Sequence, residues 1–255
     1  MADYKKIRYE MNAGIARITL DRPEKRNALD AEVISNLKAA LQEAAAAPVR
    51  VVALTGAGSD FCSGADLDAL RTTFENGPLE NISEARAMAE LFQALRGHRC
   101  PVVAVVKGRA LAGGCGLASA CDIVLAQESS RFGYPEVNIG FIPAMVMAIL
   151  RRSVSEKRAF EWIVSGEIFS AQAAYAAGLV TQVFPDAEFD SSVNSFLENL
   201  AAKSASAVSL SKHLLYHMDG MSLEAALEAG VQANAIARMT EDCQAGVEAF
   251  LRKRN

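Results

Sequence analysis

Two glycine-bearing turns contain the residues of this sequence that are best suited to chemistry. Residues 61–67 read FCSGADL and residues 110–116 read ALAGGCG, and each turn leads from a strand pattern into a helix pattern. Backbone N–H groups at the start of a helix have no partner within the helix, and their dipoles attract negatively charged oxygen. Two such turns that face each other would form an oxyanion hole, which stabilises a carbonyl oxygen as it gains negative charge.

Either turn alone is also compatible with a structural role or with phosphate binding, because glycine-rich turns between strands and helices serve these purposes too. The second turn lacks the closing Lys-Ser or Lys-Thr of a phosphate loop. Neither turn contains the G-x-G-x-x-G pattern of dinucleotide binding, and the chain has no G-x-S-x-G nucleophile motif. The prediction of an oxyanion hole therefore depends on the two turns together.

The elements that must position these turns alternate between strand and helix patterns. Residues 14–20 alternate apolar with small or polar side chains, as a half-buried strand does. Residues 31–47 carry apolar side chains at helical spacing, with Asp30 as an N-cap, and residues 50–55 form a second strand. Strand, helix and strand in this order predict a right-handed crossover unit.

The alternation continues to about residue 144 and then stops. A helix is expected at 83–96, and uniformly apolar strands at 101–106 and 122–126 predict a layered α/β core in which both faces of the sheet are covered. Beyond residue 144 only helices are expected, at 144–152, 155–164, 170–177, 189–203, 205–218, 222–238 and 240–253. The last helices are rich in alanine, so they pack closely on the core or against another subunit.

Composition limits the class of protein. The 255 residues are 51% hydrophobic, and the net charge of −4 lacks the basic excess typical of nucleic-acid or acidic-membrane binding. The N-terminus has no signal-peptide pattern, and no apolar run approaches the roughly 20 residues of a spanning helix, so we expect a cytoplasmic protein. The five cysteines are expected to be reduced, and His213 and His217 lack a third ligand, so no metal site is expected.

The whole pattern resembles the enoyl-CoA hydratase/isomerase, or crotonase, superfamily over nearly the full chain. The motifs that carry the resemblance are Arg22-Pro23, RNAL at 26–29, TGAG at 55–58, FCSGADL at 61–67, KGRALAGG at 107–114, CD at 121–122, RFGYPEV at 131–137, GFIP at 140–143, AGLV at 177–180 and TED at 240–242. The resemblance implies a crotonase-like α/β spiral of repeated ββα units over residues 1–195, which holds an acyl-CoA site. It also implies a C-terminal helical trimerisation region over residues 196–255, with assembly as a homotrimer or a dimer of trimers.

The resemblance further assigns roles to matching positions. The N–H groups of Ala65 and Gly113 fall where the family's oxyanion hole binds the thioester carbonyl, and Glu136 falls at the family's second catalytic glutamate. The positions implied to contact coenzyme A are Arg26, Ala28, Ser63, Asp66, Leu67, Phe250 and Lys253. No separate cofactor is implied, because coenzyme A enters as part of the substrate.

One departure from the family pattern affects the predicted reaction. Two-glutamate hydratases carry their first catalytic glutamate where this chain has Gly116. Hydration of a 2-enoyl-CoA is the reaction favoured by the family label, whereas Glu136 alone suits a Δ3-Δ2-enoyl-CoA isomerase, which needs one base to move a proton. A non-catalytic acyl-CoA-binding protein of the same fold is a third hypothesis. We expect Asp122, which follows the second turn's helix, to serve structure and not to replace the missing glutamate.

Overall fold

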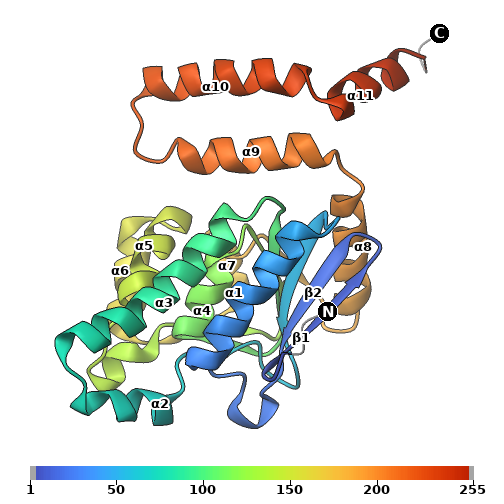
Figure 1. Ribbon diagram of the computed structural model, residues 1–255. Helices are drawn as coiled ribbons and strands as arrows, with labels where there is room; N and C mark the ends of the chain where they lie inside the picture. The colour runs from blue at the N-terminus through green and yellow to red at the C-terminus, as the bar shows by residue number, and fades with distance from the viewer. Residues whose placement is uncertain (1–3, 253–255) are drawn as a thin grey trace.

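The computed structural model describes residues 4–252 and is built around a six-stranded sheet (Figure 1). Its strands lie in the order β1 (Ile7–Asn12), β2 (Ile15–Leu20), β3 (Val51–Gly56), β4 (Val102–Val106), β6 (Ile123–Gln127) and β9 (Gln182–Phe184). β1 and β2 form an antiparallel hairpin, and all later neighbours are parallel. A second sheet contains β5 (Arg109–Leu111), β7 (Arg131–Gly133) and β8 (Ile168–Ser170).

The described chain contains eleven α-helices and three short 3-10 helices. They are α1 (Ala31–Ala46), α2 (Leu67–Thr72), α3 (Pro78–Gly97), α4 (Gly113–Ala120), α5 (Ala144–Ser153), α6 (Glu156–Ser165), α7 (Ala171–Ala176), α8 (Phe189–Ala201), α9 (Ala205–His217), α10 (Leu223–Arg238), α11 (Glu241–Arg252), η1 (Pro23–Lys25), η2 (Thr73–Glu75) and η3 (Pro135–Ile139). The predicted crossover is confirmed as β2, α1 and β3, with parallel strands. The predicted cap is confirmed too, because the Asp30 carboxylate accepts the N–H of Val33 at 2.9 Å.

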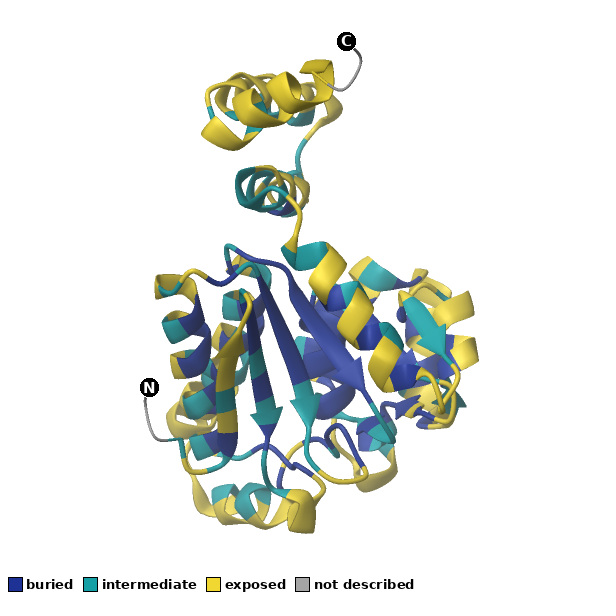
Figure 2. Ribbon diagram, turned by 90° about the vertical axis from the view of Figure 1, so that its right-hand side faces the viewer, coloured by how far each residue is buried: buried dark blue, intermediate teal, exposed yellow. Residues whose placement is uncertain are grey.

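Alternating residues of the central strands face two apolar layers. On β3, Val52 and Leu54 pack in a cluster with α1, α3 and α4, whereas Val51 and Ala53 pack in a cluster with α8. Figure 2 shows the resulting buried sheet between layers of helices. Because both faces are covered, the strands carry apolar residues at consecutive positions, and the predicted layered α/β core is confirmed.

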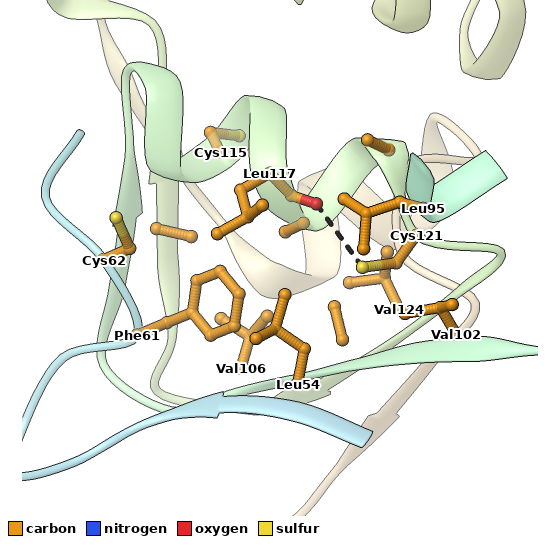
Figure 3. Packing of buried hydrophobic residues seen from close by; sticks show 14 of the residues in the cluster. Leu54, Phe61, Cys62, Leu95, Val102, Val106, Cys115, Leu117, Cys121 and Val124 are labelled. Carbon is orange, nitrogen blue, oxygen red and sulfur yellow. Dashed lines mark hydrogen bonds between the residues drawn. The ribbon is translucent and has the colours of Figure 1, made fainter. Parts of the chain in front are cut away.

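The apolar floor beneath α4 fixes the position of that helix. Every residue of α4 after Gly113 is buried. In Figure 3 Leu117 points toward Leu54 and Phe61, and the Cys121 thiol donates to the Leu117 carbonyl at 3.4 Å. A helix packed on all sides cannot shift without disturbing its neighbours, so the N-terminus of α4 is held in place.

Two expectations about the elements are wrong. Helix α3 begins at Pro78, five residues before the expected start. Its first two turns are exposed, and their large apolar residues, Leu79 and Ile82, do not belong to the buried face that marks the rest of the helix. The Glu80 carboxylate accepts the N–H of Gly77 at 2.6 Å and caps that end instead. The expectation of helices alone after residue 144 also fails, since β8 and β9 lie there. Each has only three residues, too few to show an alternating pattern.

The C-terminal helices divide between the sheet and the space beyond it. Helix α8 covers one face of the sheet through Phe189, Val193 and Leu197. Helix α9 lies along one end of the core and α10 and α11 lie beyond it, as Figures 1 and 2 show, and α10 and α11 bury none of their described residues. The predicted domain division after residue 195 falls inside α8 and stays a prediction.

A buried ion pair fastens α9 to the core. The Lys212 ammonium lies 2.7 Å from a carboxylate oxygen of Asp122 and also donates to the carbonyls of Leu95 and Cys100. The Tyr216 hydroxyl donates to the other Asp122 oxygen at 2.6 Å. Asp122 therefore has the structural role that was predicted, although its partners on α9 were not foreseen.

Two further observations concern sulfur and membranes. The five cysteines are unpaired, and all but the half-buried Cys243 are buried, as expected for reduced thiols. Within residues 4–252, no helix is both long and apolar enough to cross a bilayer.

Candidate active site

The first glycine-bearing turn is held against Leu29 by two backbone hydrogen bonds. The N–H of Leu29 donates to the Gly64 carbonyl at 2.8 Å, and the N–H of Asp66 donates to the Leu29 carbonyl at 2.8 Å. In a parallel bridge of this kind, the residue between the two bonded positions directs its own N–H to the opposite side. The N–H of Ala65 consequently points away from Leu29.

The second turn lies directly beside the first. The N–H of Cys62 donates to the Arg109 carbonyl at 3.0 Å, and the N–H of Leu111 donates to the Cys62 carbonyl at 2.9 Å. A Cβ atom added to Gly113 would lie 3.8 Å from the nitrogen of Ala65. The N–H groups of Ala65 and Gly113 are thus neighbours, and neither has an acceptor within the described chain. The two turns face each other as predicted.

Two residues with positive φ shape this pair of donors. Ala112 has φ +51° and ψ −130°, a conformation that costs a residue with a side chain about 1–3 kcal/mol. Gly64 has φ +98°, and a Cβ atom there would lie 2.7 Å from the Cβ of Ala112. Glycine is therefore required at position 64, and the strain at Ala112 occurs at the residue directly before the Gly113 donor. Strain of this kind has no signal in the sequence.

Glu136 is a buried carboxyl group in the same cavity. It lies in η3 with 7% of its surface exposed, and its Oε2 atom has no hydrogen-bond partner in the described chain. Burial raises the pKa of Glu136 above the ordinary value of a glutamate. A buried carboxyl group with a raised pKa and a free oxygen is suited to accept or donate a proton.

A cavity of about 570 Å³ joins these groups. Its wall includes Ala65, Gly113 and Glu136. The predicted coenzyme A contacts Arg26, Ala28, Ser63, Asp66 and Leu67 also line it. The inner wall is apolar and is formed by Leu70, Met88, Phe92, Ile142, Met145 and Val146. The cavity therefore combines two backbone donors, one carboxyl group and a surface suited to an aliphatic chain.

Val146 blocks the direction in which a side chain at position 116 would project. A Cβ atom on Gly116 would lie 2.3 Å from a methyl carbon of Val146 and 3.2 Å from the ring of Phe92. Val146 is on α5 and is buried. The chain thus lacks the first glutamate of the family pattern and also fills the adjoining space with an apolar side chain.

Arg22 supports the first turn and was not predicted to do so. Its guanidinium donates to the Ala28 carbonyl at 2.8 Å and lies 3.0 Å from a carboxylate oxygen of each of Asp30 and Asp66. Asp66 in turn caps α2. Burial alone would raise the pKa of Asp66, but the hydrogen bonds from Arg22 and from two backbone N–H groups hold it below its ordinary value. The Asp66 carboxylate is therefore engaged in structure, although its residue lines the cavity.

Of the two predicted contacts near the C-terminus, Phe250 is placed away from this cavity within the single chain. Phe250 lies on α11 and lines a separate hollow among the C-terminal helices. Lys253 lies outside the described residues.

Comparison with known proteins agrees with this arrangement. The family model described as "Enoyl-CoA hydratase/isomerase" matches residues 10–255. This chain belongs to that family. Members of the family are enzymes that act on acyl-CoA thioesters, and the crotonase-superfamily resemblance seen in the sequence is confirmed.

Individual relatives match along almost the whole chain. A Thermus thermophilus protein with the provisional name enoyl-CoA hydratase is 39% identical over 94% of this chain and 95% of its own length. Human enoyl-CoA hydratase domain-containing protein 3 is 34% identical over 94% of this chain and 79% of that protein. A crystal structure of enoyl-CoA hydratase from Mycobacterium smegmatis superposes with a TM-score of 0.94 at 30% identity, covering 98% of this chain and 97% of that one. The crotonase fold is thereby confirmed for this family member.

Proposed function

We propose that the protein binds an enoyl-CoA thioester in the 570 Å³ cavity and transfers a proton at the carbon next to the thioester carbonyl. The N–H groups of Ala65 and Gly113 would bind the carbonyl oxygen, and Glu136 would carry the proton. Removing a proton from this carbon places negative charge on the oxygen, where fixed donors lower the barrier. One such donor typically stabilises the transition state by about 3–4 kcal/mol.

The single observation that carries this proposal is the free carboxyl oxygen of Glu136 in a cavity that also contains two unpaired N–H groups. A buried polar atom without a partner in the described chain is costly, so it is kept where a ligand supplies the partner. The proton of a bound thioester would be that partner.

The geometry favours isomerisation of a 3-enoyl-CoA to a 2-enoyl-CoA. In this reaction one base removes a proton from C2 and returns it to C4, so Glu136 is sufficient. Hydration commonly uses two carboxylates to hold and activate water, and here Val146 fills the space beside Gly116. Hydration of a 2-enoyl-CoA remains the second candidate, because the names of the relatives favour it.

The coenzyme A portion would lie at the open side of the cavity, along the turn that contains Arg26, Ala28 and Ser63. Arg26 is exposed and has no ion-pair partner in the described chain, so its charge is available for a phosphate. No separate cofactor is proposed. Saturable binding of acetyl-CoA in a calorimetric titration supports this placement, and absence of binding at millimolar concentration contradicts it.

The reaction can be determined by supplying both classes of substrate. The protein is incubated with crotonyl-CoA and, separately, with 3-hexenoyl-CoA, and the products are identified by chromatography. We expect 2-hexenoyl-CoA from the 3-enoyl substrate. Formation of 3-hydroxybutyryl-CoA from crotonyl-CoA, without isomerisation of 3-hexenoyl-CoA, would establish hydration and contradict isomerisation.

A pair of variants tests the role of Glu136. Glu136→Gln keeps the shape of the side chain and removes the base, so turnover should fall about 10²- to 10⁴-fold while acyl-CoA binding persists. Glu10→Gln, at an exposed position on β1, is the matched control and should retain full activity. If Glu136→Gln is as active as the natural protein, Glu136 has no part in the mechanism. Binding without turnover of any acyl-CoA would instead favour the non-catalytic alternative.

We also propose assembly as a homotrimer or a dimer of trimers. Helix α10 buries no residue in the single chain and exposes Leu223, Leu227, Val231 and Ile236. Apolar side chains exposed along one helix are typical of a subunit interface. Sedimentation equilibrium should give a mass of three or six chains, and a monomer would contradict the proposal.

A further inference from the structure

A second hollow lies directly behind the inner wall of the catalytic cavity. It has a volume of about 590 Å³, lies between α3, α5 and α9, and opens to solvent. Phe92 and Met145 line both spaces, so these two side chains form the partition between them. Met145 is unbranched and only half-buried, and such a side chain moves aside easily.

The two spaces follow a single stripe of helix α3. Met88 lines the catalytic cavity, Phe92 lines both spaces, and Arg96 lines only the second. Residues four apart lie on the same face of a helix, about 6 Å from one another along its axis. Ile149 continues the wall on α5, one turn beyond Met145. A hydrogen bond of about 2.9 Å covers part of that distance, so an aliphatic chain that passes the partition needs only about two or three further methylene groups before a terminal carboxylate reaches Arg96.

The far end of the second hollow is basic. Arg96, His213 and His217 line it, and no aspartate or glutamate does so among the described residues. The nearby Asp219 is paired with Arg152. No carboxylate lies within ion-pair distance of the Arg96 guanidinium in the described chain. The apolar spaces on the two sides of the Phe92 and Met145 partition, followed by the Arg96 cation, suit a ligand with an apolar chain and an anionic end.

Tyr216 holds Arg96 in a conformation that leaves its donors free. The guanidinium carbon lies 3.9 Å from the centre of the Tyr216 ring, and the Tyr216 hydroxyl is bonded to Asp122. A guanidinium stacked on a ring uses its face for that contact, while its N–H groups radiate in the plane. Those N–H groups match the two oxygens of a carboxylate.

We infer that the second hollow binds the distal end of an acyl chain that carries a terminal carboxylate, with Arg96 as its partner. This inference rests on the proposed function, because the thioester end must occupy the catalytic cavity. The substrate class is then a coenzyme A monothioester of a medium-length dicarboxylic acid. The first cavity binds the reacting end, and the second selects the charged end.

Binding of unreactive thioesters tests the inference without relying on turnover. Calorimetry compares octanoyl-CoA with the mono-CoA thioester of octanedioic acid, on the full-length protein. We expect the dicarboxylic thioester to bind about tenfold more tightly, as a charge-assisted hydrogen bond allows. Butanoyl-CoA and the mono-CoA thioester of butanedioic acid serve as the short pair. That pair should show no preference for the carboxylate, because its chain is too short to reach Arg96.

Substitutions at Arg96 then assign the preference to this residue. The measured quantity is the affinity for the eight-carbon dicarboxylic thioester divided by the affinity for octanoyl-CoA. Arg96→Met should lower this ratio about tenfold. Arg96→Lys keeps a charge but loses the planar guanidinium, so it should give an intermediate ratio. Arg86→Met, at an exposed position on the same helix, is the matched control and should leave the ratio unchanged. Thermal unfolding confirms that each variant is folded.

The possible outcomes separate this inference from the proposed function. Equal affinity of the natural protein for the two eight-carbon thioesters overturns only the carboxylate subsite. Equal loss of affinity for both thioesters in Arg96→Met does the same. If neither thioester binds the natural protein, the acyl-CoA site itself is refuted.

Discussion

The contact between positions 116 and 146 predicts a specific energetic coupling. Gly116→Ala places a Cβ atom 2.3 Å from a methyl carbon of Val146, which must move. Overpacking of this kind costs about 1–3 kcal/mol of unfolding free energy, offset in part by about 1 kcal/mol from the better helix propensity of alanine. Val146→Ala removes two buried methyl groups and should cost about 2 kcal/mol.

The double variant should be more stable than the sum of the single effects. Once Val146 is shortened, the clash disappears and the new methyl group of Ala at 116 fills part of the vacated space. We therefore expect a favourable coupling energy of about 1–3 kcal/mol between the two changes.

Urea unfolding of the natural protein, the two single variants and the double variant, all at one protein concentration, measures this coupling energy. The dependence of the unfolding free energy on urea concentration is compared among them, to ensure that they share a common unfolded state. A second cycle that pairs Gly116→Ala with Val33→Ala is the control. Val33 is buried on α1 and is not among the closest neighbours of position 116. Its coupling should be within about 0.5 kcal/mol of zero. A coupling energy equally close to zero for Gly116→Ala with Val146→Ala would refute the steric explanation.

Four further predictions concern the site and its support. Because the pKa of Glu136 is raised, the acid limb of kcat/KM should lie above the ordinary glutamate range near about 4.3. A raised pKa means that the folded protein favours the protonated form of Glu136. The stability that this form contributes is fully present below the pKa of the unfolded state, and it is lost as the pH rises through the pKa of the folded state. Glu136→Gln should thus increase the free energy of unfolding more at pH 8 than at pH 4; an equal change at both would contradict the raised pKa. Gly64→Ala should abolish turnover, because its Cβ would lie 2.7 Å from the Cβ of Ala112 and displace the donors; unchanged kcat would exclude this steric account. Lys212→Met leaves Asp122 without its buried cation and should cost about 3–5 kcal/mol in urea unfolding, whereas a loss below about 1 kcal/mol would show that the pair is dispensable.

Local patterns predicted the parts of the fold that depend on burial of a repeating face. Residues 31–47 show a continuous apolar stripe and form α1, and the apolar strands at 101–106 and 122–126 form β4 and β6 within a residue or two. The start of α3 and the strands β8 and β9 were missed. The first is exposed, and the others are too short for a period to be detected.

The sequence predicted the features of the site that depend on residue type. It did not predict the features that depend on contacts between residues far apart in the chain. The two glycine turns and the family resemblance placed Ala65, Gly113 and Glu136, which the structure brings to one cavity. The contact of Val146 with position 116 joins residues thirty positions apart, and no local pattern indicates it. The same is true of the ion pair between Arg22 and Asp66, which joins residues 44 positions apart.

The bridge pattern around Leu29 has a consequence for how the protein acquires its site. The donors at Ala65 and Gly113 belong to separate crossover units, and each is positioned only after Leu29, Cys62 and Arg109 have docked together. Contacts between such distant segments form late in folding, since their loop-closure entropy must be overcome first. A nascent chain that has made only its early strands thus has not yet brought the N–H groups of Ala65 and Gly113 together. Amide hydrogens of these bridging residues should exchange together, as one cooperative unit, because the loss of any bridge releases both turns.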